Sequence, residues 1–194
     1  MAKKSVVKSD HVTSLKGARV HLRILERADI PTTTRWMNSE YISDIMGYLP
    51  TMSLEQQYEW YDRTKNDRSR YIFAICQNKD ARHIGNVAIG NVDTLHRHGM
   101  FSIFLAGTAD QAKGIGSEAT MLVLGFAFEK LNLNKVYLRT SPRFTQAIHM
   151  YDRLGFVREG VMREHSYANG KYEDKIMYSM LRKEYDRAVE EKRG

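Results

Sequence analysis

Apolar residues in the first third of the chain follow the period of a strand and then that of helices. In residues 20–24, valine, leucine and isoleucine alternate with histidine and arginine, which predicts a half-buried strand. Helical or helix-turn segments are expected next, within 26–40 and 51–69. The second should begin at Ser53, because Gln56 follows it at the spacing of a capping box.

The middle of the chain predicts a run of strands and then a core helix. Residues 70–77 and 83–92 are strand candidates, and the turn-rich segment between them indicates a hairpin. Residues 99–107 are nearly all apolar, so we expect a third strand that is buried on both faces. A helix should follow from Gly114 to about Leu131, with apolar residues spread so widely around it that little of it can face water.

The last third predicts a strand, a helix and a hairpin. The strand lies within 134–141, and the helix 145–154 ends before Gly155, where a left-handed cap is favoured. Residues 157–181 have the pattern of two strands turned at Asn169–Gly170. This order of elements predicts a mixed α/β fold, in which helices flank one mostly antiparallel central sheet, and not a Rossmann doubling or a barrel.

Length and composition favour one ordinary domain. The 194 residues are 42% hydrophobic, enough for a single core, so we expect one domain over 17–194 and a basic flexible arm over 1–16. No apolar stretch reaches the roughly 18 residues of a membrane span or forms a secretory leader, and we expect no membrane partner. The single cysteine, Cys76, excludes an internal disulfide and predicts a reducing, cytoplasmic location.

The formal net charge of +7 raises the possibility of a nucleic-acid partner. Much of the excess lies in residues 1–17, where four lysines stand against one aspartate, and the body of the chain has no basic stripe. We therefore expect no nucleic-acid partner and favour a small polyanionic ligand.

Two glycines, Gly114 and Gly116, precede the core helix and suggest phosphate binding. A Walker loop fails here, because Gly114 follows Lys113 where a hydroxyl residue is needed. The spacing to Ala119 fits a dinucleotide motif, but no strand directly precedes it and the next strand ends without an acidic residue for the ribose. Neither nucleotide fingerprint is satisfied.

A third loop pattern, Gln-x-x-Gly-x-Gly, matches Gln111–Gly116 at every specified position. It is followed in order by KLNLNKVYLRT (130–140), QAIHMYDRLGF (146–156) and NGKYEDKIMYSMLRKEY (169–185). With these four motifs the chain resembles, over roughly residues 18–185, the GNAT family of N-acetyltransferases. Within that family it is most similar to the ribosomal-protein and spermidine acetyltransferases.

The resemblance implies the GNAT fold and acetyl-CoA as cosubstrate. A helix N-terminus offers free N–H groups and a partial positive charge, and small residues let it approach a pyrophosphate closely. By resemblance, the diphosphate would be bound by Gln111, Ala112, Lys113, Gly114, Ile115, Gly116 and Ser117. The pantetheine arm would pair like an added strand with the backbone of Ile103, Phe104 and Leu105, beside Phe144 and Ala147.

Tyr151 and His98 are the candidate catalytic residues. Tyr151 holds the place of the family tyrosine, and a phenol can protonate a leaving thiolate as general acid. His98 is a candidate for the base, directly or through water, because imidazole titrates near neutral pH. His96 and His98 also resemble a metal pair, but no third ligand follows at a recognisable spacing, so no metal is expected.

Two positions depart from the family pattern. Relatives in the spermidine branch often carry glutamate where this chain has Met100, and relatives commonly carry asparagine where it has Phe144. These departures leave open an acetyl-CoA-binding sensor or interaction module without turnover.

The acceptor is also left open by the residues expected near it. Aromatic side chains suit an amino sugar or a peptide end, and acidic ones would attract a polyamine: Trp36, Tyr41, Tyr48, Trp60 and Tyr61, and Glu40, Asp44 and Glu55. The sequence therefore predicts acetyl transfer from acetyl-CoA to a primary amine by direct attack in a ternary complex. The amine belongs to an amino sugar, free or nucleotide-linked, a polyamine or a protein N-terminus. The family also implies a possible homodimer.

Overall fold

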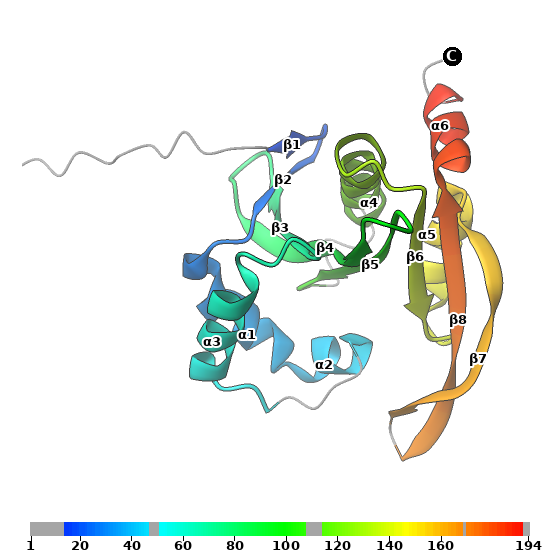
Figure 1. Cartoon of the computed structure of the whole chain (residues 1–194). Helices are drawn as coiled ribbons and strands as arrows, with labels where there is room; N and C mark the ends of the chain where they lie inside the picture. Colours follow the sequence, from blue (N-terminus) through cyan, green and yellow to red (C-terminus); the bar gives the residue numbers. More distant parts are fainter. Residues whose placement is uncertain (1–13, 47–50, 108–113, 169, 192–194) are drawn as a thin grey trace, which may run out of the picture.

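The computed structural model describes residues 14–46, 51–107, 114–168 and 170–191, and these form one sheet with helices on both faces (Figure 1). The strands lie in the order β1-β2-β3-β4-β5-β6-β8-β7, and only β5 and β6 run parallel. Their bounds are β1 Leu15–Lys16, β2 Val20–Ile24, β3 Tyr71–Gln77, β4 His83–Asp93, β5 His98–Leu105, β6 Lys135–Thr140, β7 Val157–Ala168 and β8 Lys171–Leu181.

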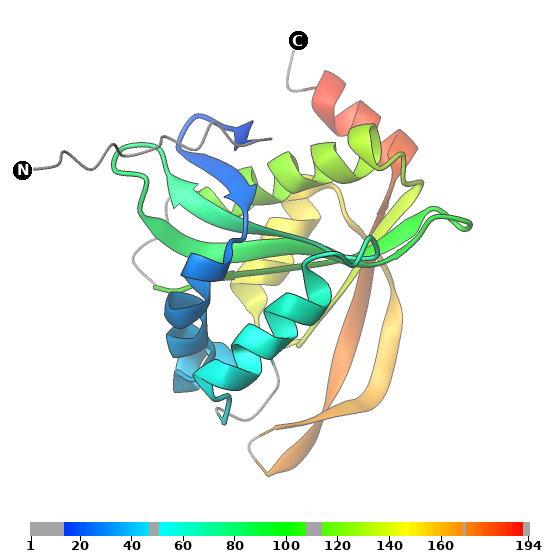
Figure 2. The same ribbon diagram turned by 60° about the vertical axis from the view of Figure 1, so that its left-hand side comes forward.

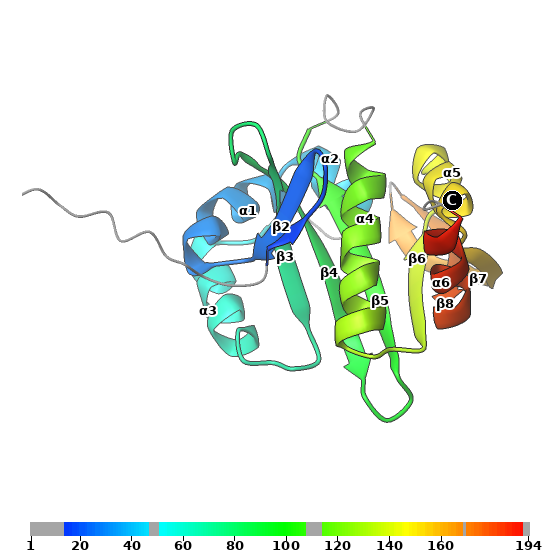
Figure 3. The ribbon, with the colours of Figure 1, turned by 90° about the horizontal axis from the view of Figure 1, so that it is seen from above.

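Helices cover the two faces unequally. The helices α1–α3 lie under one face of the β2–β5 half, and α4 crosses the opposite face (Figures 2 and 3). Their bounds are α1 Ile30–Met37, α2 Glu40–Met46, α3 Leu54–Thr64, α4 Ile115–Gly125, α5 Thr145–Leu154 and α6 Arg182–Glu190. A 3₁₀ turn, Arg27–Asp29, precedes α1, and a π-helical turn, Phe126–Lys130, continues α4.

The main core lies between the sheet and α4. Apolar residues of α4 such as Val123 and Leu124 are fully buried against β2–β6, together with Tyr151 and Leu154 of α5. A smaller cluster around Ile30 and Ala74 lies on the other face, beneath α1 and α3. A helix that is apolar nearly all round needs this depth of burial, so the composition of α4 accounts for its central place.

The parallel strands β5 and β6 pair over only three residues. The register joins His98–Met100 to Lys135–Tyr137, and no pair follows. Beyond that point β5 continues beside β4 as far as Leu105, and β6 continues beside β8 as far as Thr140. Each strand therefore has an edge without a partner among the described residues, and the two edges face one gap in the sheet.

Most of the expected elements are confirmed, including the strand at 20–24 and the helix at 145–154. The capping box at α3 is also present: the Gln56 N–H donates to Ser53 Oγ (3.1 Å), and the Ser53 N–H donates to Gln56 Oε1 (3.0 Å). The core helix ends at Lys130, one residue before the expected end. The expected hairpin forms, with Gly170 at φ 79°, and Asn169 lies outside the described residues.

Four expectations about the elements were wrong. The sheet begins before residue 17, because Leu15 pairs with Leu22 in β1 and β2. The segment after β2 forms three helices, with α2 separate from α1, and α6 was not expected. Residues of β5 are not buried on both faces: Phe101 and Leu105 face the core, whereas Ser102 lines a cavity on the other side. The apolar composition of this segment does not reveal that its side chains alternate between the core and a cavity.

The end of α5 generates a stability prediction. Gly155 has φ 93° in the left-handed region, which costs a residue with a side chain about 1–2 kcal/mol. We expect Gly155→Ala to lower the free energy of unfolding by about that amount in urea denaturation. Gly160→Ala is the matched control, because φ at Gly160 is not positive and an added Cβ meets no described atom within 4 Å. Equal losses in both variants would contradict the prediction.

Candidate active site

The open edge of β5 presents alternate backbone groups to the gap. The Ala106 N–H donates to the Ile84 carbonyl (2.8 Å), and Phe104 pairs with Asn86 in the same register. Since antiparallel residues alternate in direction, the backbone of Phe104 faces β4, whereas the N–H and C=O groups of Ile103 and Leu105 face the gap. Two of the three expected backbone positions are therefore available to a ligand there. The Phe104 side chain instead lines a cavity on the α1–α3 face.

Tyr151 projects from α5 into the apolar core beside this gap. Its ring packs against those of Phe101, Phe156 and Tyr178, with centroids 6.2, 5.6 and 6.1 Å away. The side chain is 7% exposed, and no described group forms a hydrogen bond with its hydroxyl. Burial raises the pKa of Tyr151 well above its usual value. The phenol is therefore neutral across the physiological range, and it retains a proton to donate.

The N-terminus of α4 lies at one end of the gap and is built for close approach. Gly114 caps the helix with φ 71°, a conformation that favours glycine. Ile115 is buried in the core and anchors the first turn. An added Cβ on Gly116 would meet Met150 Sδ at 3.4 Å, an ordinary contact. Gln111, Ala112 and Lys113 lie outside the described residues.

Two arginines that sequence reasoning missed flank this turn. Arg153 of α5 donates to Ser117 Oγ (3.3 Å). The Arg19 guanidinium lies against Gly114, 2.9 Å from where a Cβ would stand. Glu118 holds the Arg19 segment in place by accepting from the N–H groups of Arg19 (2.8 Å) and Val20 (3.2 Å). The two cations add to the positive end of the helix, which suits a polyphosphate. Arg19 comes from a distant segment, and Arg153 stands within the 146–156 motif, but that motif does not reveal its contact with Ser117, 36 residues away.

A cavity of about 370 Å³ lies on the α1–α3 face and reaches β5. Its floor includes Met100, Ser102 and Phe104, and its walls include Met37 and Trp60. None of its described lining residues is acidic or a histidine. An adjoining cavity of about 480 Å³ is larger, but none of its described lining residues belongs to β5. The smaller cavity is therefore the better acceptor site, because it meets the open edge at Met100.

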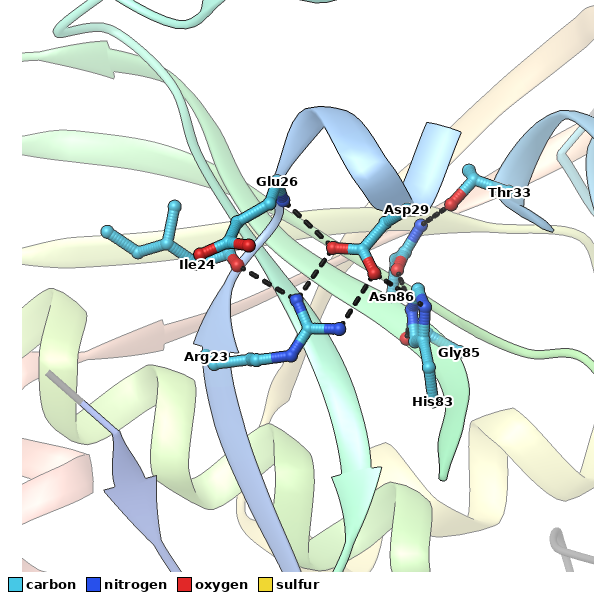
Figure 4. Close-up of polar contacts among 8 residues, drawn as sticks. All are labelled: Arg23, Ile24, Glu26, Asp29, Thr33, His83, Gly85 and Asn86. Carbon is cyan, nitrogen blue, oxygen red and sulfur yellow. Dashed lines mark hydrogen bonds and ion pairs between the residues drawn. The ribbon is translucent and has the colours of Figure 1, made fainter. Parts of the chain in front are cut away.

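A polar network supports one wall of this cavity (Figure 4). Asn86, which lines the cavity, donates to Thr33 Oγ1 (3.4 Å) and lies 2.7 Å from His83 Nε2. His83 Nδ1 is 3.5 Å from Asp29, which forms a two-point ion pair with Arg23 (2.6 and 2.7 Å). The network ties β2, β4 and α1 together and holds the Asn86 amide between Thr33 and His83.

The ionisation of Asp29 is set by this network. Burial raises the pKa of Asp29, but hydrogen bonds from Arg23, His83 and the Glu26 N–H outweigh burial, and the pKa falls well below its usual range. The same pairing raises the pKa of Arg23. Asp29 is therefore charged at neutral pH and well into the acidic range, and its ion pair with Arg23 persists over that range.

His98 is not brought together with the other candidates. It begins β5, opposite Lys135, with its ring centroid 5.8 Å from that of Tyr137 and 6.3 Å from that of His96. Its Nδ1 is buried without a hydrogen-bond partner among the described residues. Phe101, which Tyr151 contacts, lies roughly 10 Å further along the strand and on its other face.

The remaining expected residues are only partly assembled. Ala147 packs against the main core, and Phe144 caps α5 beneath the Arg143 guanidinium at 4.5 Å. Trp36 packs edge-on against His83 and Phe104. Of the acidic residues, Asp44 is paired with Arg143. Neither Glu40 nor Glu55 lines the cavity, and Tyr48 lies outside the described residues.

Comparison with known proteins gives the family. A family model described as an acetyltransferase (GNAT) domain matches residues 19–157. The chain belongs to the GNAT acetyltransferase family. It is therefore an N-acetyltransferase, and the resemblance that the four motifs indicated is confirmed.

Among characterised GNAT proteins, the chain is similar to bacterial spermidine N(1)-acetyltransferases. It is 30% identical to the Vibrio cholerae enzyme over 173 residues, 89% of this chain and 99% of the relative. It is 28% identical to the Escherichia coli enzyme, over 86% of this chain and 88% of the relative. A crystal structure of the V. cholerae enzyme with CoA and spermine has a TM-score of 0.83 at 28% identity, covering 87% of this chain and 99% of that one. The mixed α/β GNAT fold is thus confirmed.

The described residues contain neither a membrane-spanning helix nor a cluster of metal ligands. No helix within the described residues is long and apolar enough to cross a membrane. Across the same residues, no group of histidine, cysteine, aspartate or glutamate side chains is arranged to hold a metal ion.

The Asp29 network of the GNAT domain generates a pH prediction. The folded-state pKa of Asp29 lies below its unfolded value near 3.9, so its stabilisation is complete above about pH 4 and is lost as the pH falls further. We expect Asp29→Asn to lower the free energy of unfolding by about 2–3 kcal/mol at pH 7, by leaving Arg23 unpaired. The deficit should shrink when denaturation is repeated below pH 4.

Asp62→Asn is the control for this prediction, because Asp62 pairs with Lys65 at the exposed surface. Its effect should be small, because solvent screens an exposed ion pair. A deficit for Asp29→Asn that does not change with pH would show that the ion pair does not cause it.

Proposed function

We propose that the chain transfers an acetyl group from acetyl-CoA to a primary amine by direct attack in a ternary complex. The observation that carries this proposal is the gap beside β5. It has free backbone groups at Ile103 and Leu105, the neutral phenol of Tyr151 on one side and the cavity floored by Met100 on the other. A donor and an acceptor can reach this gap from opposite faces of the sheet.

The residues around the gap fit the parts of acetyl-CoA. The α4 N-terminus, with Arg19 and Arg153 beside it, suits the diphosphate, and the expected Gln111–Lys113 segment immediately precedes it. The amides of the pantetheine arm suit the free groups of β5, as an added strand would. Phe144 would support the arm by packing, since its ring lies at the start of α5. The thioester supplies the activated acetyl group.

The chemistry requires two proton movements. The amine nitrogen attacks the thioester carbonyl, a C–N bond forms, the C–S bond breaks, and the thiolate takes a proton from Tyr151. One of the N–H groups of Ile103 and Leu105 would polarise the thioester oxygen. The apolar surroundings that raise the pKa of Tyr151 also disfavour a bare thiolate, so the phenol and the thiol stay matched despite the shift.

The base role of His98 remains a prediction, and its place at the start of β5 gives it little support. The described cavity lining contains no carboxylate or imidazole. We therefore propose that the amine attacks in its neutral form and passes the proton that it loses on acylation to water in the cavity, and that the Tyr151 phenolate regains its proton from water. A sensor that does not catalyse acetyl transfer would need neither an acceptor cavity nor a buried phenol without a described hydrogen-bond partner. The cytoplasmic location and the homodimer also remain predictions.

A thiol-release assay tests the function. Acetyl-CoA is incubated with purified protein and with amino sugars, polyamines, amino acids and N-terminal peptides in turn. Release of free thiol with an acetylated product from at least one class supports the proposal. Binding of acetyl-CoA with no product from any amine would favour the sensor.

Removal of the Tyr151 hydroxyl should slow turnover without weakening the fold. We expect Tyr151→Phe to reduce kcat about 10- to 100-fold, because general-acid help to the leaving thiolate is lost. Its melting temperature should not fall, since no described group bonds the hydroxyl. Tyr178→Phe is the control, a buried tyrosine whose ring contacts Tyr151. Unchanged kcat in Tyr151→Phe would rule out the acid role.

The left-handed backbone conformation of Gly114, at the start of α4, should affect the affinity for CoA. Gly114→Ala would strain a residue at φ 71° and press a Cβ against Arg19, so we expect the Kd for CoA to rise about tenfold by calorimetry. Gly160→Ala is the control, because Gly160 lies in β7 and not at the α4 N-terminus, and an added Cβ there meets no described atom within 4 Å. If CoA binds both variants equally well, the α4 N-terminus does not hold the diphosphate in this way.

A further inference from the structure

The side chain of Arg70 lines the wall of the acceptor cavity, and its charge has no partner among the described residues. It directly precedes β3 and lines the cavity beside Trp60 and Ile72. Its Nε is buried and has no hydrogen-bond partner, and no other ion pair or side-chain hydrogen bond of Arg70 occurs within the described part of the chain. Arg70 is half-buried, and burying even one guanidinium N–H without an acceptor is costly, because that group has lost water without replacement.

The nearby carboxylate does not neutralise Arg70. Asp67 lies close enough for the Arg70 charge to contribute to lowering the pKa of its carboxyl. However, Asp67 Oδ1 accepts from the Ser69 N–H (2.8 Å) and the Ser69 hydroxyl (2.7 Å), and these contacts are the larger causes of the lowered pKa. Asp67 is thereby committed to the turn before β3. The Arg70 fork remains available to a ligand.

An open lane, formed over Arg70, Gly90 and Met100, connects Arg70 to the gap beside β5. Tyr71 pairs with Ile89, so Arg70 stands opposite Gly90, and Gly90 in turn pairs with Met100. The three residues form a row across three strands and line the same cavity. An added Cβ on Gly90 would meet nothing within 4 Å. Neighbouring strands lie about 4.8 Å apart, so the row spans roughly 10 Å from Arg70 to the residue where the gap opens.

The rest of the cavity complements an anion better than a second cation. Its polar groups include the amides of Gln57, Asn86 and Asn91, and Arg70 is its only charged residue among those described. A polyamine that entered would bring ammonium groups beside a guanidinium in a cavity without a described carboxylate. Amides and an arginine fork suit oxyanions, which accept two parallel N–H bonds.

Building on the proposed function, we propose that the acceptor is an amine carrying an oxyanion, a carboxylate or a phosphate, that pairs with Arg70. The amine then lies near Met100 and the oxyanion lies within roughly 10 Å of it, along the lane over Gly90. This selectivity differs from the substrate named for the similar V. cholerae and E. coli enzymes. Glutamates of this chain that would attract a polyamine, such as Glu55, lie outside the described cavity lining.

Calorimetric titration with CoA present, and turnover with acetyl-CoA, test this assignment. The carboxylate probes are ω-amino acids of increasing length and their methyl esters. The phosphate probes are glucosamine 6-phosphate and glucosamine, and spermidine is the cationic probe. Arg70→Met is compared with wild type, and Arg63→Met is the matched control, because Arg63 is an exposed residue of α3 that lines neither cavity.

The expected result is a charge preference that disappears with Arg70. Wild type and Arg63→Met should bind the best anionic amine roughly 10- to 100-fold more tightly than its neutral partner. Arg70→Met should bind the two equally and should accept spermidine better. Its melting temperature should stay the same or rise, because a half-buried charge whose Nε has no described partner has been removed. Whether carboxylate or phosphate gives the larger preference identifies the oxyanion.

A second variant tests the lane independently. Gly90→Leu places a side chain in the open space between Arg70 and Met100, and we expect it to weaken binding of the longer anionic amines about tenfold while the shortest ones change little. The assignment is overturned if wild type prefers spermidine or neutral amines, or if Arg70→Met keeps the anion preference. Anion-selective binding without any acetylated product would instead disprove the proposed function and leave the Arg70 site in place.

Discussion

The partial pairing of β5 with β6 is the constraint on which the rest of the molecule depends. These strands share only the register from His98–Met100 to Lys135–Tyr137, and then each continues with a different neighbour. Beyond this register, backbone N–H and C=O groups that would bond to a neighbouring strand have no such partner, although they lie beside a well-packed core. The sheet is therefore incomplete at the one place where α4, α5 and the acceptor cavity converge, and an extended ligand can complete it.

Rigid supports hold the walls of this opening in place. On one face, α4 is packed against the sheet by its apolar surface, and Glu118 connects its first turn to the segment before β2. On the other face, the ion pair of Arg23 with Asp29 fixes the network that holds Asn86. Across the gap, Arg143 joins α2 to β8 through Asp44 and Glu173. These contacts hold the described walls of the opening in place relative to one another.

Local signals in the sequence were sufficient for most elements and for the family, but not for what the tertiary structure assembles. The helix at 145–154 and the cap at Gly155 follow from short-range patterns, and Tyr151 was placed by its motif. By contrast, β5 was taken for a fully buried strand, since composition does not show that one face opens onto a cavity. Arg19, Arg70 and Arg153 reach the site from separate segments, so their roles depend on contacts that no spacing rule contains. The chemistry of imidazole suggests His98 as a base, but it gives no information on how far His98 lies from the other candidates along the strand.

The contact between Glu118 and the turn at Gly17 has a consequence for handling the protein. A Cβ on Gly17 would collide with the Glu118 carboxylate, so the turn that leads into β2 is held directly against α4. The first residues of the sheet are thus coupled to the N-terminus of α4. Any affinity tag or fusion partner joined upstream needs a spacer that keeps this junction undisturbed, whereas a tag after α6 would avoid it.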